Sequence, residues 1–429
     1  MDPSRPTYDL VGFLGSDLGL AVAARNSLGV LTATGRLGGT VAAALPTPAS
    51  VLKRLVRGLR GGGRGATRRP RGDAGLASRR VNLFHMNPPE IALFVPEWRD
   101  GLDPSVRNVT VPFWELPVLP RGWEPVLSAM DAVMAPTRFV QAACSSAVAA
   151  DRLIHYPQAA FLPDGVRASR DAWGLAADQT VFALAFDFRS DVDRKNPWAA
   201  IEAFQAAFPG DEGVALMIKT SQAFDPVFSA RADELRARIA PDRRIRVVDQ
   251  ILPYPEVLGL YASCDVLISL HRSEGLGLHL MEAMSLGKVV VATNWSGNTD
   301  FMTQANSIPI GFQLVPLRTR HPTYGQEVGR PGQVWADADV GEAVQARRRL
   351  HAEPEWRTAI GIAADRDMNA RRQDVLSGAA FEVLETLLAR AASRGTALTR
   401  ATLRTLVATA GREAIKKGGA LVGRLLSQG

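Results

Sequence analysis

The strongest constraint on the fold is a stretch in which two carboxylates flank a glycine-rich turn. Glu274 and Glu282 lie eight residues apart, and Gly-Leu-Gly follows the first of them. Short apolar runs predict buried strands before and after this stretch, over residues 265–270 and 288–293. A helix that ends at Gly287 would connect the two strands. Because helical crossovers join parallel strands, the pattern predicts an α/β fold with a parallel sheet.

This unit predicts a ligand with two chemically different parts. Eight residues are slightly more than two helical turns, so Glu274 and Glu282 fall near one face. Gly275 and Gly277 let a ligand approach the backbone, and N–H groups at a helix start attract an anion. Carboxylates repel phosphate, so the combination suits a sugar that is joined to a diphosphate. Glu274 would lie just beyond a strand end, where open α/β sheets bind ligands.

These residues resemble the retaining glycosyltransferases of GT-B fold, family 4 (glycosyltransferase group 1). The hallmark of that family is a Glu, seven residues and a second Glu, followed by a helix of small residues and a Val-rich strand. Residues 270–275 and 295–302 resemble a branch of mannosyl- and rhamnosyltransferases that build bacterial surface polysaccharides. The resemblance covers residues 180–340 closely and 80–140 more loosely. It implies two doubly wound, Rossmann-like domains that face a cleft.

The resemblance also implies roles for the residues of the stretch. Glu274 would be catalytic and contact hydroxyls of the transferred sugar, and Glu282 would contact the ribose of the nucleotide. Three further residues would complete the site for the donor sugar and nucleotide: Ser273, Gly277 and Leu278. His279 lies inside the motif, and we expect it on the other face of the helix, in a packing role.

A second charged segment follows the strand expected over residues 181–186. It contains Arg189, Arg194 and Lys195. A departing nucleoside diphosphate gains negative charge, so fixed cations at this position would stabilise the transition state. The resemblance implies that these three side chains bind the donor diphosphate, with Lys195 as the principal cation. Ordinary solvated loop charges are the alternative interpretation.

The same segment contains Asp191-Val192-Asp193, which has the letters of an Asp-x-Asp metal motif. It lies among the cations that would take the place of a metal ion. We therefore expect a metal-independent enzyme, with no cofactor besides the nucleotide-sugar substrate.

Two positions in the N-terminal half are further candidates. Gly19 ends the glycine-containing turn that begins at Gly15, and the resemblance implies that this turn approaches the donor diphosphate. An ordinary strand–helix loop is the alternative. His85 follows the strand expected over residues 81–84. Some family-4 enzymes have a histidine of this domain that contacts the sugar, so His85 is a catalytic candidate, although a structural histidine is equally expected.

The pattern of apolar segments predicts two α/β domains. Strands are expected over residues 8–14, 81–84, 109–113, 132–135, 153–156, 181–186, 214–219 and 245–248. Helices are expected over residues 89–98, 124–130, 139–150, 197–208, 227–239 and 255–263. The expected domains are an acceptor-side domain, a nucleotide-sugar domain, a helix that crosses back, and a basic amphipathic tail, over residues 1–175, 176–374, 375–392 and 393–429.

The net charge of +7 is unevenly distributed along the 429 residues. Residues 52–80 contain ten Lys or Arg and one acid, and without them the chain would carry a net charge of −2. This segment is expected to be a basic loop inserted in the first domain. The tail from Arg394 contains seven basic residues and one acid. Both segments predict docking to an anionic membrane surface, since each basic residue contributes ~1 kcal/mol there. A solvated loop is one alternative, and nucleic-acid binding is not expected because no stacking aromatics accompany the charge.

Other features favour a cytoplasmic protein, peripheral on the inner face of the membrane. Two distant cysteines, Cys144 and Cys264, fit a reducing compartment. No apolar run approaches the ~20 residues of a membrane span, and the first residues lack the apolar core of a secretion signal.

Together these features predict a hexosyltransferase that uses a nucleoside-diphosphate sugar, with GDP-mannose as the expected donor. Its acceptor would be a glycan or a lipid-linked saccharide in cell-surface polysaccharide synthesis. A soluble metabolite as acceptor is the alternative within enzymes. The alternative to an enzyme is a catalytically inactive GT-B protein that serves as a binding partner or scaffold.

Overall fold

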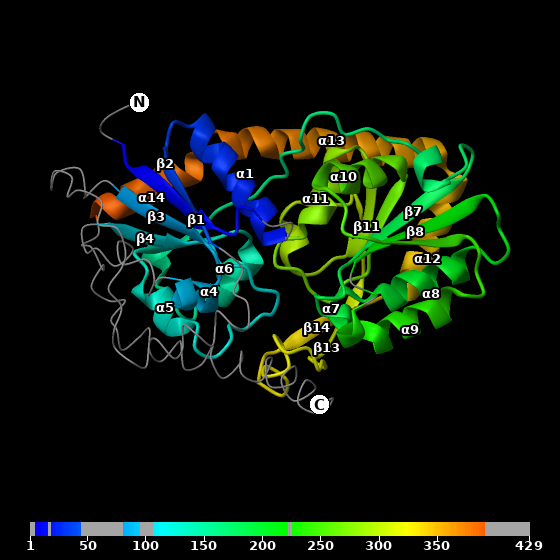
Figure 1. Ribbon diagram of the computed structural model, residues 1–429, viewed down its shortest axis with the longest axis horizontal. Helices are drawn as coiled ribbons and strands as arrows, with labels where there is room; N and C mark the ends of the chain where they lie inside the picture. Colours follow the sequence, from blue (N-terminus) through cyan, green and yellow to red (C-terminus); the bar gives the residue numbers. More distant parts are fainter. Residues whose placement is uncertain are drawn as a thin grey trace, which may run out of the picture. The chain divides into compact units, whose positions relative to one another are not determined.

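The computed structural model describes residues 5–15, 19–43, 80–94, 106–221, 223 and 225–390 (Figure 1). The chain divides into two compact units. The first comprises residues up to Gln158 and those from Val375 onward, and the second runs from Ala159 to Asp374. Residues 159–175, which the sequence-based division assigned to the first domain, belong to the second unit. There Arg170 forms an ion pair with Asp265 at 2.8 Å.

The first unit contains a sheet of six parallel strands in the order β2-β1-β3-β4-β5-β6. The strands are β1 (Thr7–Gly12), β2 (Leu37–Ala42), β3 (Arg80–His85), β4 (Arg107–Thr110), β5 (Ala132–Ala135) and β6 (Leu153–His155). Its helices before Gln158 are α1 (Gly19–Ala33), α4 (Pro88–Phe94), α5 (Glu124–Ala129) and α6 (Arg138–Cys144). The strand order reverses between β1 and β3, which makes this a doubly wound sheet.

Strand β2 has no counterpart among the expected strands, because its two glycines suggest a turn. Gly38 and Gly39 instead let β2 approach β1 closely. A Cβ on Gly39 would lie 3.0 Å from Oδ1 of Asp9, and one on Gly38 would lie 3.2 Å from Cβ of Thr7. The missing side chains therefore allow β2 to pair with β1 at the edge of the sheet.

Two expected elements of this unit are shorter in the structure. The strand expected over residues 109–113 ends at Thr110, two residues before Pro112, which cannot donate to a neighbouring strand. The helix expected to reach residue 150 ends at Cys144. The hydroxyls of Ser145 and Ser146 donate to backbone oxygens of the last turn, and such bonds compete with continuation of the helix.

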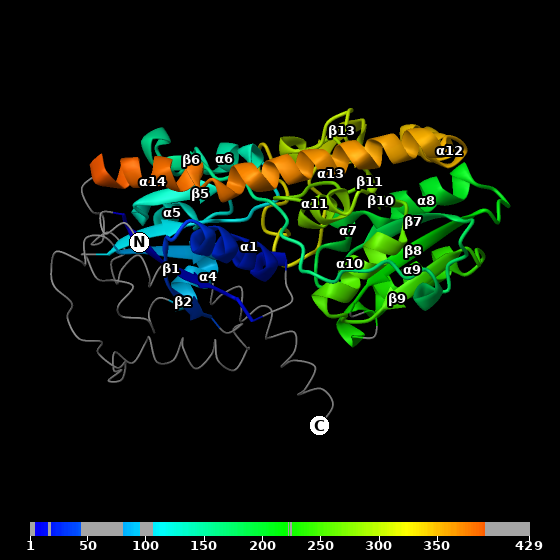
Figure 2. The ribbon, with the colours of Figure 1, turned by 90° about the horizontal axis from the view of Figure 1, so that it is seen from above.

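The segment expected as a crossing helix contains the end of α13 (Pro354–Leu376) and α14 (Ala379–Arg390). Gly378, with φ +75°, separates the two helices. Helix α14 packs on the first sheet beside β6 (Figure 2). Phe381 makes edge contacts with the rings of Tyr8 and Tyr156, and Glu385 binds buried Arg36 at 2.8 Å. The described residues from Val375 on are thus part of the first unit.

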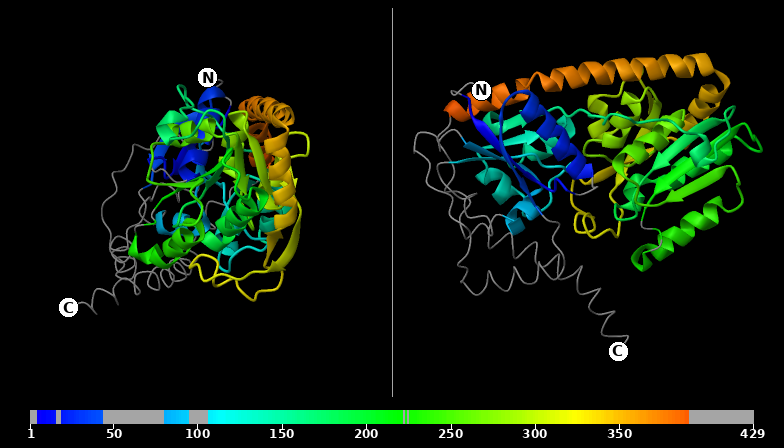
Figure 3. Two further views of the ribbon diagram at one scale, coloured as in Figure 1. Left: turned by 90° about the vertical axis from the view of Figure 1, so that its right-hand side faces the viewer. Right: turned by 45° about the horizontal axis from the view of Figure 1, so that its top comes forward.

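The second unit contains another sheet of six parallel strands, in the order β12-β11-β10-β7-β8-β9 (Figure 3). The strands are β7 (Thr180–Ala185), β8 (Val214–Thr220), β9 (Ile245–Asp249), β10 (Val266–Ser269), β11 (Val289–Thr293) and β12 (Ile308–Ile310). The helices are α7 (Val192–Lys195), α8 (Pro197–Ala207), α9 (Ser229–Ile239), α10 (Tyr254–Ser263), α11 (Leu278–Ser285) and α12 (Val340–Ala352), besides most of α13. An antiparallel pair, β13 (Phe312–Pro316) and β14 (Val334–Ala338), follows the sheet. The strand order reverses between β7 and β10.

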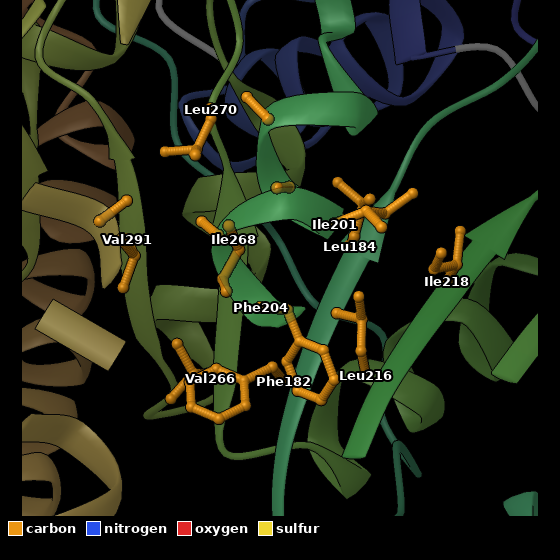
Figure 4. Packing of buried hydrophobic residues seen from close by; sticks show 14 of the residues in the cluster. Phe182, Leu184, Ile201, Phe204, Leu216, Ile218, Val266, Ile268, Leu270 and Val291 are labelled. Carbon is orange, nitrogen blue, oxygen red and sulfur yellow. The ribbon is translucent and has the colours of Figure 1, made fainter. Parts of the chain in front are cut away.

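A core of buried apolar side chains holds β7 and β10 in place (Figure 4). Phe182 on β7 packs against Phe204 of α8 at 6.1 Å and Phe208 at 5.4 Å between ring centroids. Val266 and Ile268 of β10 are fully buried in the same cluster. Strands buried on both faces are continuous apolar runs, as the sequence of these two shows. The core therefore makes a rigid support for the loops that leave the two strands.

The predicted fold class is confirmed: each unit is a parallel, doubly wound α/β sheet. In the part of the chain that the structure describes, no helix combines the length and apolar character that crossing a membrane requires. The tail from residue 393 lies outside the described residues, as does the basic segment except for Arg80. Arg80 begins β3 and forms an ion pair with Asp9 at 2.5 Å.

Candidate donor-binding site

The two strands at the order reversal of the second sheet, β7 and β10, each lead into a charged loop. In open α/β sheets, ligands bind outside the carboxyl ends of the strands at such a reversal. Lys195, at the end of α7, follows β7, and Glu274 follows β10. The structure brings the two side chains together, with 2.5 Å between Nζ of Lys195 and Oε1 of Glu274. The two charges predicted from separate motifs thus share one position at the sheet edge.

Short side-chain bonds hold α7 in place. Asp191 caps the helix, and its Oδ1 accepts hydrogen bonds from the backbone N–H groups of Asp193 and Arg194. Its Oδ2 accepts from Thr319 at 2.6 Å. Asn196 has a left-handed conformation with φ +48°, and its Nδ2 donates to the backbone oxygen of Leu270 at 3.0 Å. These contacts tie the loop after β7 to the end of β10, so the position of Lys195 is determined.

Arg194 gives Glu274 a second cationic neighbour. Its Nη1 donates to the backbone oxygen of Ser273 at 2.8 Å and lies 3.3 Å from Oε2 of Glu274. The guanidinium also lies over the ring of Tyr324, 5.8 Å from its centroid. Arg194 is buried, and it fixes the turn that carries Glu274.

The two cations determine the charge state of Glu274. Burial by itself would raise the pKa of this carboxyl, but the charges of Lys195 and Arg194 outweigh burial, and the pKa lies well below its usual range. Glu274 is therefore a carboxylate at neutral pH. Two fixed positive charges next to it leave a net positive site, which suits a diphosphate.

The backbone around Glu274 is held by the loop that follows β11. The N–H of Glu274 donates to the hydroxyl of Ser296 at 2.7 Å, and its carbonyl accepts from the N–H of Gly297 at 2.8 Å. A Cβ on Gly297 would lie only 2.4 Å from the carbonyl oxygen of Gly275. Only glycine allows the two loops to approach this closely.

Gly277 and Leu278 form the start of α11. Gly277 has φ +83° and Leu278 is the first helical residue. The free N–H groups of this first turn lie immediately after the Glu274 turn. Ser273, which directly precedes Glu274, is buried. Its hydroxyl has no hydrogen-bond partner among the described residues.

Glu282 lies on the same helix in a different electrostatic environment. It is buried, and Oε1 accepts a hydrogen bond from the hydroxyl of Tyr254 on α10 at 2.9 Å. Burial raises the pKa of Glu282 to about 8, although the Tyr254 hydrogen bond opposes the rise. The carboxyl is thus mostly protonated at neutral pH while no ligand is bound. The predicted carboxylate pair consists of one ionised and one protonated group.

Two histidines line the inner side of the Glu274 turn. Nε2 of His271 lies 3.1 Å from Oδ1 of Asn298, and its Nδ1 lies 3.1 Å from the Ser269 hydroxyl. Burial lowers the pKa of His271. His279 was expected on the other face of α11 in a packing role, but the charges of Lys195 and Glu274 both act on its ring. Helical side chains lean toward the N-terminus, which turns a first-turn residue toward the preceding loop.

Arg189 is paired with an acidic residue of its own loop. Its guanidinium pairs with Asp187 at 2.6 Å, and nearly half of the side chain is exposed. Burial raises the pKa of Asp187, but hydrogen bonds from Arg189 outweigh it and the pKa is lowered.

In the first unit, His85 and Gly19 follow the strands β3 and β1 that flank its order reversal. His85 is fully buried, and its Nε2 lies 3.1 Å from the hydroxyl of Ser27, which also accepts from Tyr156. Burial lowers the pKa of His85 to about 3, so the ring is neutral. Gly19 begins α1, and among the described residues no atom beyond its chain neighbours and its own helix backbone lies within 4 Å of a Cβ built there. Residues 16–18 of its turn lie outside the described residues.

Sequence reasoning missed Tyr254, Tyr324 and Thr319 as supports of the site. Tyr254 is the first residue of α10 and follows a strand end, a position from which a side chain can reach the ligand edge. No comparable signal exists for Tyr324 and Thr319, because the residues after β13 follow no regular pattern. Within the described ranges, no three or more His, Cys, Asp or Glu side chains are grouped so that they could hold a metal ion.

Residues 200–315 match the family model described as glycosyl transferases group 1. The match covers α8 to β13 and includes Glu274 and Glu282. No sequence of a curated protein matches the chain significantly. The part of the second unit that carries Glu274 and Glu282 is therefore similar to group 1 glycosyl transferases, which supports the predicted glycosyltransferase enzyme.

Solved structures are similar in fold. A sucrose-phosphate synthase from Thermosynechococcus elongatus gives a TM-score of 0.63 at 14% identity, over 90% of this chain and 100% of the other. Anabaena HepE in complex with UDP and glucose gives 0.56 at 14% identity, over 89% and 100%. S. aureus TarM gives 0.51 at 12% identity over 71% of this chain, which spans only 55% of the length of TarM. These similarities establish the predicted GT-B fold of the chain.

Proposed function

We propose that the whole chain is a retaining family-4 glycosyltransferase that moves a hexose from a nucleoside-diphosphate sugar to a saccharide acceptor. The observation that carries this proposal is the contact between Lys195 and Glu274 at the order reversal of the second sheet. It combines a cation for the diphosphate with an ionised carboxylate for the sugar. The family match over residues 200–315 supports the same assignment.

In this proposal the nucleotide sugar lies along the carboxyl edge of the second sheet. Lys195 binds the diphosphate, with Arg194 and Arg189 as further cations and the Gly19 turn as a backbone contact. The first turn of α11, at Gly277 and Leu278, presents its N–H groups to the phosphates or sugar, and Ser273 lies in the adjoining turn. Glu282 accepts hydrogen bonds from the ribose hydroxyls, and Glu274 accepts them from the transferred sugar.

The reaction breaks the bond between the anomeric carbon and the β-phosphate oxygen. The acceptor hydroxyl oxygen forms the new bond on the same face, and its proton passes to the departing phosphate. Lys195 stabilises the charge that develops on the leaving group. Since fixed cations supply this charge, we propose that no metal ion takes part, and transfer should persist in excess chelator. His85 is proposed as a contact of the transferred sugar.

Two observations bear on the identity of the donor, and they favour different nucleotide bases. The resemblance to mannosyl- and rhamnosyltransferases favours GDP-mannose. The HepE structure contains UDP and glucose, which favours a uridine donor. Both donors belong in the first assay.

The proposed acceptor is a glycan or lipid-linked saccharide of cell-surface polysaccharide synthesis. The proposed location is the cytoplasmic face of the membrane, with residues 52–80 and 394–429 as the contact to anionic lipid. Flotation with anionic vesicles tests this part, because deleting both segments should abolish binding.

Hydrolysis of UDP-glucose and GDP-mannose by the purified chain tests the enzyme proposal without a known acceptor. We expect slow release of one nucleoside diphosphate, abolished by Glu274→Ala and by Lys195→Ala. Binding of a nucleoside diphosphate without hydrolysis or transfer would favour an inactive binding protein. Binding of neither UDP nor GDP would overturn the proposal.

A further inference from the structure

His279 carries a buried polar atom that the proposed donor contacts do not use. Its Nε2 is buried and has no hydrogen-bond partner among the residues that the structure describes. The residue is the second of α11, two positions after the left-handed Gly277. A buried polar group without a partner is unfavourable, and it persists where a ligand satisfies it.

The ring lies within electrostatic reach of the charged groups of the candidate site. Side chains of α-helices lean toward the N-terminus, so a residue in the first turn projects over the preceding loop. The charged groups that act on His279 come from both loops of the site: Lys195 and Arg194 from α7, and Glu274 and His271 from the segment after β10. His279 is therefore next to the charges assigned to the diphosphate and sugar.

The ring is neutral in this environment. Burial and the Lys195 charge lower the pKa of His279 to about 3, although the charge of Glu274 opposes them. A neutral imidazole still has one N–H that can donate a hydrogen bond. Next to two cations, a neutral donor adds a contact to an anion without adding repulsion between like charges.

We propose that His279, as a neutral imidazole, donates a hydrogen bond from Nε2–H to the diphosphate of the bound nucleotide. This inference rests on the proposed function, since it assigns a further residue to the same site. The proton stays on Nε2 throughout, so His279 acts as a hydrogen-bond donor beside Lys195 and transfers no proton. Among side chains, glutamine can place an amide N–H close to the position of Nε2, whereas leucine retains only the volume.

Calorimetric titration with UDP and GDP at pH 7.5 tests the inference. With whichever of the two binds, His279→Leu should weaken affinity about tenfold, which corresponds to ~1.4 kcal/mol. His279→Gln should remain within about twofold of the parent chain. His351→Gln is the matched control, because His351 contacts Thr180 and Asp211 away from the site. The ratio of the His279→Leu and parent dissociation constants should stay constant from pH 6 to 8. A role that needs the imidazolium would make that ratio fall as pH rises.

Nitrogen-15 labelling of histidine gives a second readout that needs no folded variant. The Nε2 signal of His279 should remain that of a protonated, neutral ring and should shift on saturation with the nucleotide. Unchanged affinity in His279→Leu, an equal loss in His279→Gln, or no shift of the signal would each overturn the inference. In those cases Lys195→Ala would still weaken binding. If the parent chain binds neither nucleotide, the proposed function fails together with this inference.

Discussion

The two sheets have the same kind of order reversal but place different chemistry beside it. In the second unit, β7 and β10 lead to Lys195, Arg194 and Glu274, which are charged and in mutual contact. In the first unit, β1 and β3 lead to a neutral group in which His85 and Tyr156 meet the Ser27 hydroxyl. The same topology therefore supports an ionic site in one unit and a neutral hydrogen-bonded cluster in the other.

This difference indicates which parts of a ligand each unit is suited to bind. A diphosphate needs fixed positive charge, and the site of the second unit places the buried Arg194 and the partly buried Lys195 at its strand-order reversal. A neutral cluster suits hydroxyl groups, which need donors and acceptors but no countercharge. Substitutions in the ionic site and in the neutral cluster should therefore have different effects.

The largest effect is expected for Glu274→Gln. Removing the carboxylate charge should lower donor turnover by about 10²–10³-fold, the usual loss for one fixed electrostatic contact at a reacting centre. Nucleoside-diphosphate affinity should hold or increase, because Lys195 and Arg194 lose their anionic partner and are freed for the phosphates. Turnover and calorimetric titration measure the two quantities separately.

Glu256→Gln, at an exposed position of α10, is the control for Glu274→Gln, and neither turnover nor nucleotide affinity should change in it. A parallel loss of turnover and nucleotide affinity in Glu274→Gln would contradict the assignment of this carboxylate to the sugar. Thermal melting should accompany both variants, because an unpaired buried cation destabilises a fold.

His85 should make the protein sensitive to acid. In the unfolded chain it binds a proton below about pH 6.5, whereas in the folded protein the pKa is about 3. Between these values the unfolded state holds more protons, so stability rises with pH and is lost as pH falls. His85→Gln should remove about 1.4 kcal/mol of that dependence per pH unit.

Urea unfolding of the parent chain and His85→Gln from pH 6.5 to 4.5 measures this slope. Nucleotide affinity should not change, because His85 is assigned to the transferred sugar, which UDP and GDP lack. Equal slopes in the two proteins would show that His85 is solvated and not buried.

Glu282 should make nucleotide affinity depend on pH. Its pKa is about 8 without ligand, whereas ribose hydroxyls that donate to it favour the ionised form. Binding then releases a proton below pH 8, so affinity should rise with pH by up to about tenfold per unit and level off above pH 8. Titration of the parent chain and Glu282→Gln between pH 6 and 9 checks this.

The rise of nucleotide affinity with pH should disappear in Glu282→Gln and persist in the control Glu256→Gln. Tyr254→Phe removes the hydrogen bond that lowers the pKa of Glu282, so its plateau should move to higher pH. A pH-independent affinity of the parent chain would contradict the ribose assignment.

The smallest effect is expected for Arg189→Ala. Its guanidinium is half exposed and already neutralised by Asp187, so nucleotide affinity should fall by about threefold at most. Titration of this variant beside the parent chain measures the loss. A loss as large as that of Lys195→Ala would show that Arg189 leaves Asp187 to bind the diphosphate.

Much of the second unit could be predicted because its signals are local. Buried parallel strands are continuous apolar runs, and the strand expected over residues 181–186 is β7 within one residue at each end. The family resemblance predicted that the Glu274 turn and Lys195 belong to one site, and each of them follows a strand end. Their contact depends only on β7 and β10 being neighbours.

Other features depend on tertiary context that the sequence does not show. Glycines in β2 resemble a turn until Asp9 and Thr7 are seen to need the space. The orientation of His279 depends on the helix starting at Leu278, so that the residue lies in the first turn. The raised pKa of Glu282 results from burial between α10 and α11, which no short motif indicates.

The most direct test of the central claim is calorimetric titration of the parent chain and Lys195→Ala with UDP and GDP. The account predicts that the parent chain binds one of the two nucleotides at a single site. It also predicts that Lys195→Ala, at a temperature well below its own melting transition, binds the same nucleotide at least about 100-fold more weakly, or ~2.7 kcal/mol. Equal affinity of the two proteins, or no binding by the parent chain, would contradict a donor site at the order reversal of the second sheet.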